Sequence, residues 1–460
     1  MTIPATSDVT ATLRSTFAGP VHVPGDHGYE TGRGSWHRTI DPHPAVVAEA
    51  AGADDVHAAV RAAREHGVPF AVQATGHGTY VPADGGVLLK TGRLNHVEVD
   101  PESRTVRAGA GALWSDVVDA AAPHGLAPLS GTLSIGVAGY TLGGGAGYLS
   151  RTFGFAADSL VRAEIVVSDG RLLTVSGDEH PDLFWAIRGG SGNFGVATSL
   201  ELLLFPVDRV YAGMSYYPTD RAEHVLRFYR DWAVDEPDEL NTSITVMRIP
   251  DAPHVPDPIR DRPVLAIRPF CLAGSVRART YLTSLLNVAG PPLVDGIAEY
   301  TFAEASAVLS GPPHPPMAVD QRFELFRDLP DDVISAVVDS VDTAVTAIEL
   351  RHWGGAMARP SAHAGPIGHR DTPFSLTSVA MAADPDGLSA GSAALDQITS
   401  WLRPHTTGGS FVNFLADPAR TASAYTPDDY RRLTEVKRDW DPDNVFRSNH
   451  HIRPAAQGAR

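Results

Sequence analysis

The sequence predicts an α+β fold with more than one domain, and three observations carry this prediction. The chain has 460 residues, more than a single compact core usually covers. Short strand-like and helix-like segments alternate through residues 1–207, where two glycine-rich segments, 75–79 and 136–147, interrupt them. From residue 208 to 405 such glycine clusters become sparse, and longer helix-like and strand-like segments alternate.

Hydrophobic periodicity and turn residues predict most elements individually. Residues 131–147 contain too much glycine for a regular element. The final helix should begin after Thr426, a residue type that favours the N-cap position. In order, we expect a strand and helix over 44–66, a strand running into the loop at 75, strands at 85–91 and 96–100, a turn at 101–104, a helix over 112–125, a hairpin over 163–176, a short helix over 180–189, a strand over 194–207, a helix over 221–234 and a strand over 263–273.

The composition disfavours several functional classes. The formal net charge is −17, and a surface this acidic repels the phosphates of nucleic acids. A membrane span needs a run of about eighteen apolar residues, and the sequence has none. Residues 1–17 lack the basic start and apolar stretch of a secretory leader. We therefore expect a cytoplasmic protein.

Three further features receive structural interpretations. Cys271 is the single cysteine, which excludes an intramolecular disulfide, and its apolar neighbours predict a buried thiol. The densest basic stretch, residues 431–438, contains interleaved acidic residues and is predicted to form a solvated helix face. Five histidines fit no short metal-ligand spacing, so no metal site is expected: His352, His363, His369, His450 and His451.

The two glycine-rich segments predict a ligand site. Glycine lets the backbone approach a ligand closely and present successive N–H groups to anionic oxygens. Two such runs, each after strand-like sequence, suit an elongated ligand with a pyrophosphate; tight turns are the simpler alternative. A Rossmann dinucleotide site fits poorly, because the residues after Gly147 do not begin a clean helix.

The first glycine segment also carries a family resemblance. Residues 69–78, PFAVQATGHG, resemble the flavin-attachment loop of the FAD-linked oxidases in the vanillyl-alcohol oxidase and p-cresol methylhydroxylase superfamily, berberine-bridge-enzyme-like branch. The resemblance runs from about Trp36 to Pro454. It implies that His77 is bonded to the 8α-methyl group of FAD. Gln73 stands where the family usually has arginine.

Three later segments extend the resemblance. Residues 131–147 resemble the flavin-flanking loop, in which many members have a cysteine that forms a second covalent bond; Thr132 occupies that position, which implies a single bond. Residues 182–198 and 411–449 match the adenine-contacting and C-terminal segments. The cofactor-binding residues implied are Gln73, Ala74, Thr75, Gly76, His77, Gly78, Thr79, Gly131, Thr132, Ile135, Gly136, Gly139, Tyr140, Gly145, Gly195, Val196, Asn413 and Asn449.

The resemblance implies a two-part FAD-binding domain of the p-cresol methylhydroxylase type over residues 1–207. A substrate domain with a helix-covered antiparallel sheet would span 208–405, and residues 406–460 would return to the first domain. The implied activity is oxidation of a small organic alcohol, amine or ring C–H by dioxygen, in specialised metabolism. The protein would be a monomer or a homodimer.

The catalytic base is harder to place. The family's usual tyrosine and carboxylate bases have no counterpart at the matching positions. Four side chains remain as candidates: Tyr140, Tyr80, His352 and His369. A flavoprotein cyclase without net oxidation is therefore an alternative, and a nicotinamide-dependent dehydrogenase or a non-catalytic FAD-binding protein fits less well.

Overall fold

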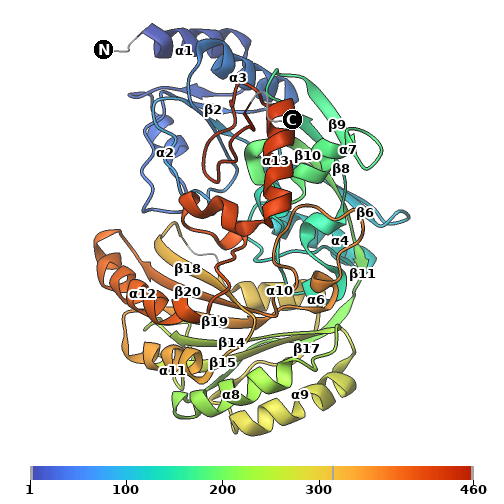
Figure 1. Ribbon diagram of the computed structural model, residues 1–460, viewed down its shortest axis with the longest axis vertical. Coiled ribbons are helices and arrows are strands. Elements are labelled where there is room, and N and C mark those ends of the chain that lie inside the picture. Colours follow the sequence, from blue (N-terminus) through green and yellow to red (C-terminus); the bar gives the residue numbers. More distant parts are fainter. Residues whose placement is uncertain (1–3, 313–314, 457–460) are drawn as a thin grey trace.

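The computed structural model describes residues 4–312 and 315–456, so residues 1–3 of the segment inspected for a leader lie outside it. Figure 1 shows two halves stacked along the long axis. The upper half contains the N-terminal part of the chain together with helix α13, whereas the lower half contains the middle of the chain.

The N-terminal strands form a four-stranded sheet in the order β1-β2-β4-β3. Strands β2, β4 and β3 are parallel, and α3 connects β2 to β3. Because parallel strands end at the same edge, the loops that follow β3 and β4 emerge side by side. The elements are α1 (Pro4–Thr16), β1 (Val21–His22), α2 (Tyr29–Arg33), β2 (Val46–Glu49), α3 (Ala53–His66), β3 (Phe70–Gln73) and β4 (Val87–Lys90).

A second sheet in the upper half is antiparallel, in the order β5-β6-β10-β8-β9. Its apolar residues share one core with helices α4, α5 and α7. The elements are β5 (Val97–Asp100), β6 (Thr105–Gly109), α4 (Trp114–Ala121), α5 (Val137–Leu142), α6 (Ser150–Phe153), β8 (Leu160–Val166), β9 (Leu172–Ser176), α7 (Pro181–Ile187) and β10 (Val196–Leu203), with the short pair β7 (Leu126–Ala127) and β11 (Phe205–Pro206).

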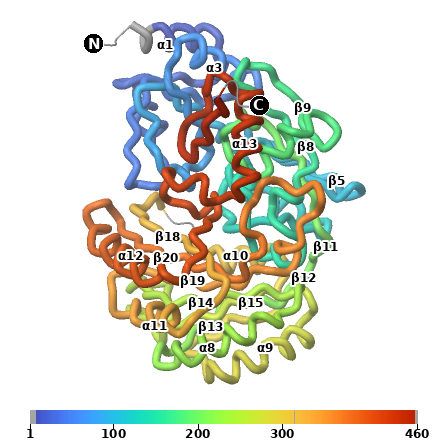
Figure 2. Tube along the Cα trace, viewed as in Figure 1, coloured from blue at the N-terminus to red at the C-terminus, as the bar shows by residue number. Residues whose placement is uncertain are grey.

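The lower half is built on a nine-stranded antiparallel sheet, with the path β16-β13-β15-β14-β19-β20-β18 and the pair β12 and β17 beside it. Helices α8, α9, α11 and α12 cover its outer face (Figures 1 and 2). The elements are β12 (Arg209–Ala212), β13 (Ser215–Tyr217), α8 (Ala222–Ala233), β14 (Leu240–Arg248), β15 (Pro263–Cys271), α9 (Ser275–Ala289), β16 (Val294–Asp295), β17 (Ala298–Thr301), α10 (Phe302–Ser310), β18 (Ala318–Phe326), α11 (Asp331–Asp339), β19 (Ala347–His352), β20 (Phe374–Ala382) and α12 (Ser389–Leu402).

The predicted α+β architecture, with an antiparallel sheet covered by helices, is confirmed. Both predicted hairpins form, β5 with β6 and β8 with β9. The prediction that segment 131–147 has no regular element was wrong, because this segment contains helix α5. The six residues of α5, VAGYTL, include one glycine, and four of the others bury apolar side chains in the core, which offsets the low helix propensity of glycine.

The chain end returns to the upper half as helix α13 (Pro427–Trp440), which packs against α7. Thr426 caps α13 as predicted, because its hydroxyl accepts a hydrogen bond from the Asp429 N–H. The predicted solvated basic face is wrong at Lys437, which is fully buried. Its ammonium donates to Asp441 Oδ2 and to the carbonyls of Asn193 and Phe446, all at 2.6 Å, so its charge is compensated inside the core.

Two findings concern the chain as a whole. Cys271 is fully buried, as predicted from its apolar neighbours. Within residues 4–312 and 315–456, no helix combines the length and the apolar character that crossing a bilayer requires.

Candidate functional site

The loop after β3 presents a row of free backbone donors. In the part of the chain that the structure describes, the N–H groups of residues 74–78 donate to no protein acceptor, whereas Thr79 N–H closes a turn onto the Gly76 carbonyl at 3.3 Å. Gly76 has a φ of +83°, a conformation that favours glycine. Backbone N–H groups need an acceptor. This loop therefore offers a cradle for an anion.

His77 lies within this loop. Its Nδ1 is 2.9 Å from the hydroxyl of Thr75, and its ring stacks on Trp36 with centroids 4.5 Å apart and planes inclined by 17°. Burial, assisted by the neighbouring His37, lowers the pKa of His77 to about 4. The imidazole is therefore neutral at pH 7 and keeps an unshared electron pair.

The second glycine segment lies against the first. A Cβ atom on Gly136 would lie 3.5 Å from the Cβ of Ala74, which places the start of α5 beside the His77 loop. A Cβ atom added at Gly139 would meet open space. Gly145 has a φ of +75° and no room for a side chain, since a Cβ atom there would come within 2.4 Å of the Tyr140 ring. The two predicted cofactor loops are thus brought together.

The other predicted cofactor residues in this region line the same loops. The Gly131 backbone packs on the ring of Tyr140. The carbonyl of Thr132 accepts from the N–H of Ile135 at 3.2 Å, and the Thr132 side chain is half-buried. Gly195, with a φ of +155°, packs on Ile165 where β10 begins. Val196 is buried against the four-stranded sheet.

Two asparagines from the C-terminal segment fix these loops. Asn449 accepts a hydrogen bond from Tyr80 N–H at 2.9 Å and donates to the Gly78 carbonyl at 2.7 Å. Asn413 accepts from Gly145 N–H at 2.8 Å and donates to the Tyr140 carbonyl at 3.2 Å. Both side chains hold the loops that the sequence assigned to the cofactor.

Gln73, the departure from the family's arginine, is buried. Its amide donates to the Gly34 carbonyl at 2.8 Å. Lys90 is its cross-strand partner, and its ammonium lies 3.3 Å from the same carbonyl. Burial lowers the pKa of Lys90 to about 8, so it is cationic at pH 7. A positive charge is therefore present next to the cradle although Gln73 carries none.

Two predicted catalytic candidates are tyrosines at the loops. The hydroxyl of Tyr80 accepts a hydrogen bond from Gln321 of β18 at 2.9 Å, which links the His77 loop to the lower sheet. Burial raises the pKa of Tyr80, and the bond from Gln321 partly opposes this. Burial also raises the pKa of Tyr140, whose hydroxyl has no hydrogen-bond partner among the described residues.

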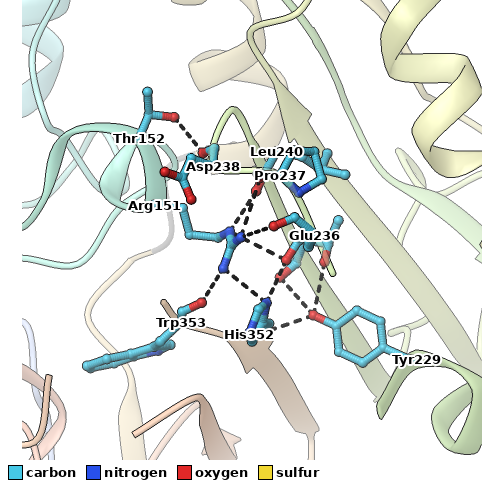
Figure 3. Close-up of polar contacts among 10 residues, drawn as sticks. Arg151, Thr152, Tyr229, Glu236, Pro237, Asp238, Leu240, His352 and Trp353 are labelled. Carbon is cyan, nitrogen blue, oxygen red and sulfur yellow. Dashed lines mark hydrogen bonds and ion pairs between the residues drawn. The ribbon is translucent and has the colours of Figure 1, made fainter. Parts of the chain in front are cut away.

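The two histidine candidates occupy different surroundings. His352 Nδ1 is 2.9 Å from Glu236 Oε2 and 3.0 Å from Arg151 Nη1 (Figure 3). Arginine can only donate and a carboxylate can only accept, so Nδ1 can satisfy one of the two. His369, with a φ of +56°, places Nε2 2.8 Å from the Ser423 carbonyl. The structure thus does not bring the four candidates into one cluster.

Figure 3 shows that Arg151 of α6 reaches across to the lower half. Its guanidinium donates to the carbonyls of Leu240 at 2.7 Å and Glu236 at 2.6 Å, and also to that of Trp353. Both Arg151 and Glu236 are buried, with 2% and 0% of their side chains exposed. We call Arg151, Glu236 and His352 the interdomain latch.

Sequence reasoning missed a charged group on the inner face of the lower sheet. Glu349 and Arg351 of β19 lie on the same face as Arg268 of β15, and both arginines bond to Glu349. The signal was present in residues 347–352, AIELRH, where polar residues alternate with apolar ones as on a two-sided strand. The histidine spacing had predicted no metal site. The described residues include no group of three or more potential metal ligands.

The donors present fit FAD. Five consecutive free N–H groups and the nearby Lys90 suit a pyrophosphate, and the open Cβ sides of Gly78 and Gly139 leave backbone accessible to a flat ring. These features, with the two-part upper half and the sheet below it, define an FAD-dependent oxidoreductase.

Comparisons with known proteins agree. A family model described as an FAD binding domain matches residues 44–176, and one described as berberine and berberine like matches residues 410–453. The (R)-6-hydroxynicotine oxidase of Paenarthrobacter nicotinovorans is 28% identical over 467 residues, which cover 95% of this chain and 97% of the relative. An FAD-linked oxidoreductase of Dictyostelium discoideum is 27% identical, covering 91% of each chain.

Solved structures share the fold. The crystal structure of 6-hydroxy-D-nicotine oxidase from Arthrobacter nicotinovorans superposes with a TM-score of 0.82 and 25% identity, covering 95% of this chain and 98% of the other. Berberine bridge enzyme from Eschscholzia californica gives a TM-score of 0.84 at 20% identity, covering 98% and 100%. The chain is therefore similar to the berberine-bridge-enzyme-like FAD-linked oxidoreductases in two matched segments and in its fold.

Proposed function

We propose that this protein is an oxidase that holds FAD through one covalent bond from His77 and uses dioxygen to oxidise a small organic molecule. The substrate would supply an alcohol, an amine or a ring C–H bond, within specialised metabolism. The observation that carries the proposal is the position of a half-buried, neutral His77 within a loop whose N–H donors have no partner among the described residues. Bound FAD supplies the acceptor for a hydride equivalent.

The chain's own residues support a single attachment. A neutral imidazole can form a bond through its free electron pair, whereas a protonated one cannot. Thr132 has no thiol, and the single cysteine, Cys271, is buried in β15 of the lower sheet. A cysteinyl second bond is therefore not part of the proposal.

Tyr80 is the candidate base that the geometry favours. It follows His77 by three residues, and its hydroxyl accepts a hydrogen bond from Gln321 on the lower sheet. A donor to the hydroxyl oxygen stabilises the phenolate that would receive a substrate proton. His352 is bound in the interdomain latch, His369 contacts a carbonyl and Tyr140 lies in the core, so we assign these three to structural roles.

We also propose that residues 1–207 with 406–460 bind FAD, and that residues 208–405 form the substrate domain. The asparagine clamps on both glycine loops support this division, because Asn413 and Asn449 both come from the C-terminal segment. The absence of an evident acid–base pair among the described residues keeps a cyclase without net oxidation as the second candidate.

Acid precipitation tests the attachment. The purified protein is denatured in acid, and the flavin spectrum of pellet and supernatant is recorded. The expected result is yellow pellet from the natural protein and yellow supernatant from His77→Ala. His96→Ala is the matched control. Because His96 is exposed, this variant should keep its flavin in the pellet. Flavin that separates from the natural protein would contradict the covalent bond.

Substrate screening with peroxide detection tests the oxidase assignment. Release of one hydrogen peroxide per product is expected under air. Product formation at an unchanged rate without oxygen consumption, and without net oxidation of the substrate, would favour the cyclase instead.

A further inference from the structure

The two faces of the lower sheet differ in polarity. Its outer face supplies the apolar core shared with α8, α9, α11 and α12. Its inner face carries polar residues that lie opposite one another on four neighbouring strands. These are Arg268 on β15, Ser243 and Thr245 on β14, Glu349 and Arg351 on β19, and Ser375 and Thr377 on β20.

This inner face contacts Tyr148, the residue that directly follows the second glycine segment. Arg268 lies over the ring of Tyr148, 5.2 Å from its centroid, and Tyr148 stacks on Phe270 two residues along β15. On β18, the Gln321 side chain bonds to Tyr80 in the His77 loop. The polar residues thus face the loops that we assign to FAD.

Arg268, Glu349 and Arg351 form what we call the arginine pair site. Arg268 Nη2 donates to Glu349 Oε1 at 3.0 Å, and Arg351 Nη2 donates to Glu349 Oε2 at 2.8 Å. Arg268 Nε donates to the hydroxyl of Ser243 at 3.0 Å. The carboxylate of Glu349 therefore has one guanidinium on each of its two oxygens.

Both guanidinium groups have N–H donors without a hydrogen-bond partner among the described residues. Arg268 Nη1 and Arg351 Nε are buried without a hydrogen-bond partner among the described residues. Arg351 Nη1 also has no partner in that part of the chain, although it is not among the buried unpaired atoms. Unpaired buried donors are unfavourable, and guanidinium N–H groups are matched best by a planar oxyanion.

The site also carries an excess positive charge. Two arginines face one carboxylate. Burial opposes ionisation of Glu349, but Arg351 and Arg268 more than offset it and lower its pKa to about 2. Burial raises the pKa of Tyr140 and of Tyr148, so these neighbouring hydroxyls stay neutral at pH 7 and do not compensate the second arginine. One positive charge remains on a largely desolvated face.

A ligand can reach the site, because part of it is exposed. The side chain of Glu349 is 24% exposed and that of Arg351 is 17% exposed, whereas Arg268 is 6% exposed. Arg268 is therefore the more buried arginine and holds Glu349 in place. Arg351 is more accessible, and its unpaired Nη1 can reach a ligand.

We propose that the arginine pair site binds a carboxylate group of the substrate, so that this enzyme acts on small organic acids. This inference rests on the proposed function, since it places the acid between the lower sheet and the flavin loops. The carboxylate would accept hydrogen bonds from Arg351 and supply the missing negative charge. Glu349 would remain ionised and hold the two guanidinium groups apart.

The test uses the flavin-loaded protein, with sodium benzoate and benzamide as probes. The two are nearly equal in shape, and only benzoate carries a negative charge. Binding is measured by titration calorimetry and by the change in the visible flavin spectrum. We expect benzoate to bind at least about tenfold more tightly than benzamide, as befits a charge-assisted bond to arginine. Equal binding of the two probes, or binding of neither, would overturn the proposal.

Three variants assign any binding to the site. Arg351→Gln should weaken benzoate binding by about tenfold or more and leave benzamide unchanged, whereas Arg351→Lys should keep part of the preference. Arg322→Gln is the matched control, because Arg322 lies on the outer face of the same sheet, paired with Asp320 and Asp396. Unchanged benzoate affinity in Arg351→Gln would contradict the assignment.

The outcomes separate this inference from the proposed function. Flavin content and peroxide release are recorded for every variant. Loss of flavin from the natural protein would refute the proposed function, whereas full flavin content without a benzoate preference refutes only the carboxylate site. If Arg351→Gln shifts the flavin reduction potential but leaves benzoate binding unchanged, the cation serves the flavin and the proposal fails.

Discussion

At the scale of single residues, the candidate site contains two histidines whose pKa is strongly lowered, the half-buried His77 and the buried His450. His77 and His450 both have a pKa lowered to about 4, and burial is the main cause in each case. His450 packs against the Tyr80 ring, with centroids 5.7 Å apart, and its Nδ1 is buried without a partner among the described residues. The candidate site therefore contains imidazoles that are neutral at pH 7 and costly to protonate.

His450 should make the folded state sensitive to acid. Its pKa is lower in the folded than in the unfolded state, so the unfolded state binds its proton first. The associated stability is present above about pH 6.5 and is lost as the pH falls toward 4. Between pH 7.5 and 5, this one group should cost about 2 kcal/mol of the free energy of unfolding. Urea unfolding at both pH values measures it.

The control is His450→Gln, which does not titrate in this range. All other groups are common to the two proteins, so the variant should lose about 2 kcal/mol less than the natural protein over the same pH interval. Parallel pH dependences would show that folding does not lower the pKa of His450.

At the scale of secondary-structure elements, the short helix α6 joins the two halves through Arg151. Replacing Arg151 with methionine would leave the fully buried Glu236 without its cation. Such a loss typically costs about 3–5 kcal/mol. We expect a clear decrease in the urea midpoint of Arg151→Met, measured by circular dichroism.

Arg162→Met is the matched control for the latch. Arg162 also pairs with a glutamate, Glu201, but 54% of its side chain is exposed, so its loss should cost less than about 1 kcal/mol. Adding Glu236→Gln to Arg151→Met should restore part of the stability. Equal effects of Arg151→Met and Arg162→Met would contradict the latch.

Helix α13 is attached by Lys437. Lys437→Met would remove three hydrogen bonds and leave Asp441 buried without its cation, although the N–H groups of Val445 and Phe446 still bond to that carboxylate. We expect a loss of about 3 kcal/mol or more in stability. Asn449, which clamps the His77 loop, follows in the same segment, so flavin content after purification should also fall.

Arg438→Met, one residue along, is the control for this prediction. Arg438 pairs with Asp439 at the surface and should tolerate the change with full flavin content. Normal flavin content in Lys437→Met would separate the anchoring of α13 from the cofactor loop.

At the scale of the whole molecule, segments far apart in the chain meet at one place. The His77 loop, helix α5 and Asn449 come from the beginning, the first third and the end of the sequence. A ligand held by all three should stabilise the folded state as a unit. FAD is therefore expected to contribute to stability as well as to chemistry.

The His77→Ala variant makes this contribution measurable. Without the covalent bond, FAD would bind reversibly, and each tenfold increase in free FAD above its Kd should add about 1.4 kcal/mol to the stability. The melting temperature of His77→Ala should thus rise with added FAD, whereas that of the natural protein should not. If the melting temperature of His77→Ala did not change with added FAD, a site shared by the three segments would be contradicted.

The sequence by itself predicted the fold class, the resemblance to FAD-linked oxidases and the two loops that we assign to FAD. This was possible because glycine spacing and short-range periodicity are local properties, read directly from segments such as 69–78. His77 and Thr132 could be singled out because the segments that contain them resemble the family's flavin loops. Helix α5 was missed because buried apolar side chains outweighed the local preference of glycine.

Only the tertiary structure decided which charges are buried and what they face. Lys437 was predicted to be solvated, and its burial depends on carbonyls and a carboxylate supplied by other segments. Arg268 and Glu349 are 81 positions apart, and Arg151 and His352 are 201 apart. Such pairs leave no mark on local periodicity, since their energies depend on desolvation and distance that arise only when the two halves of the molecule meet.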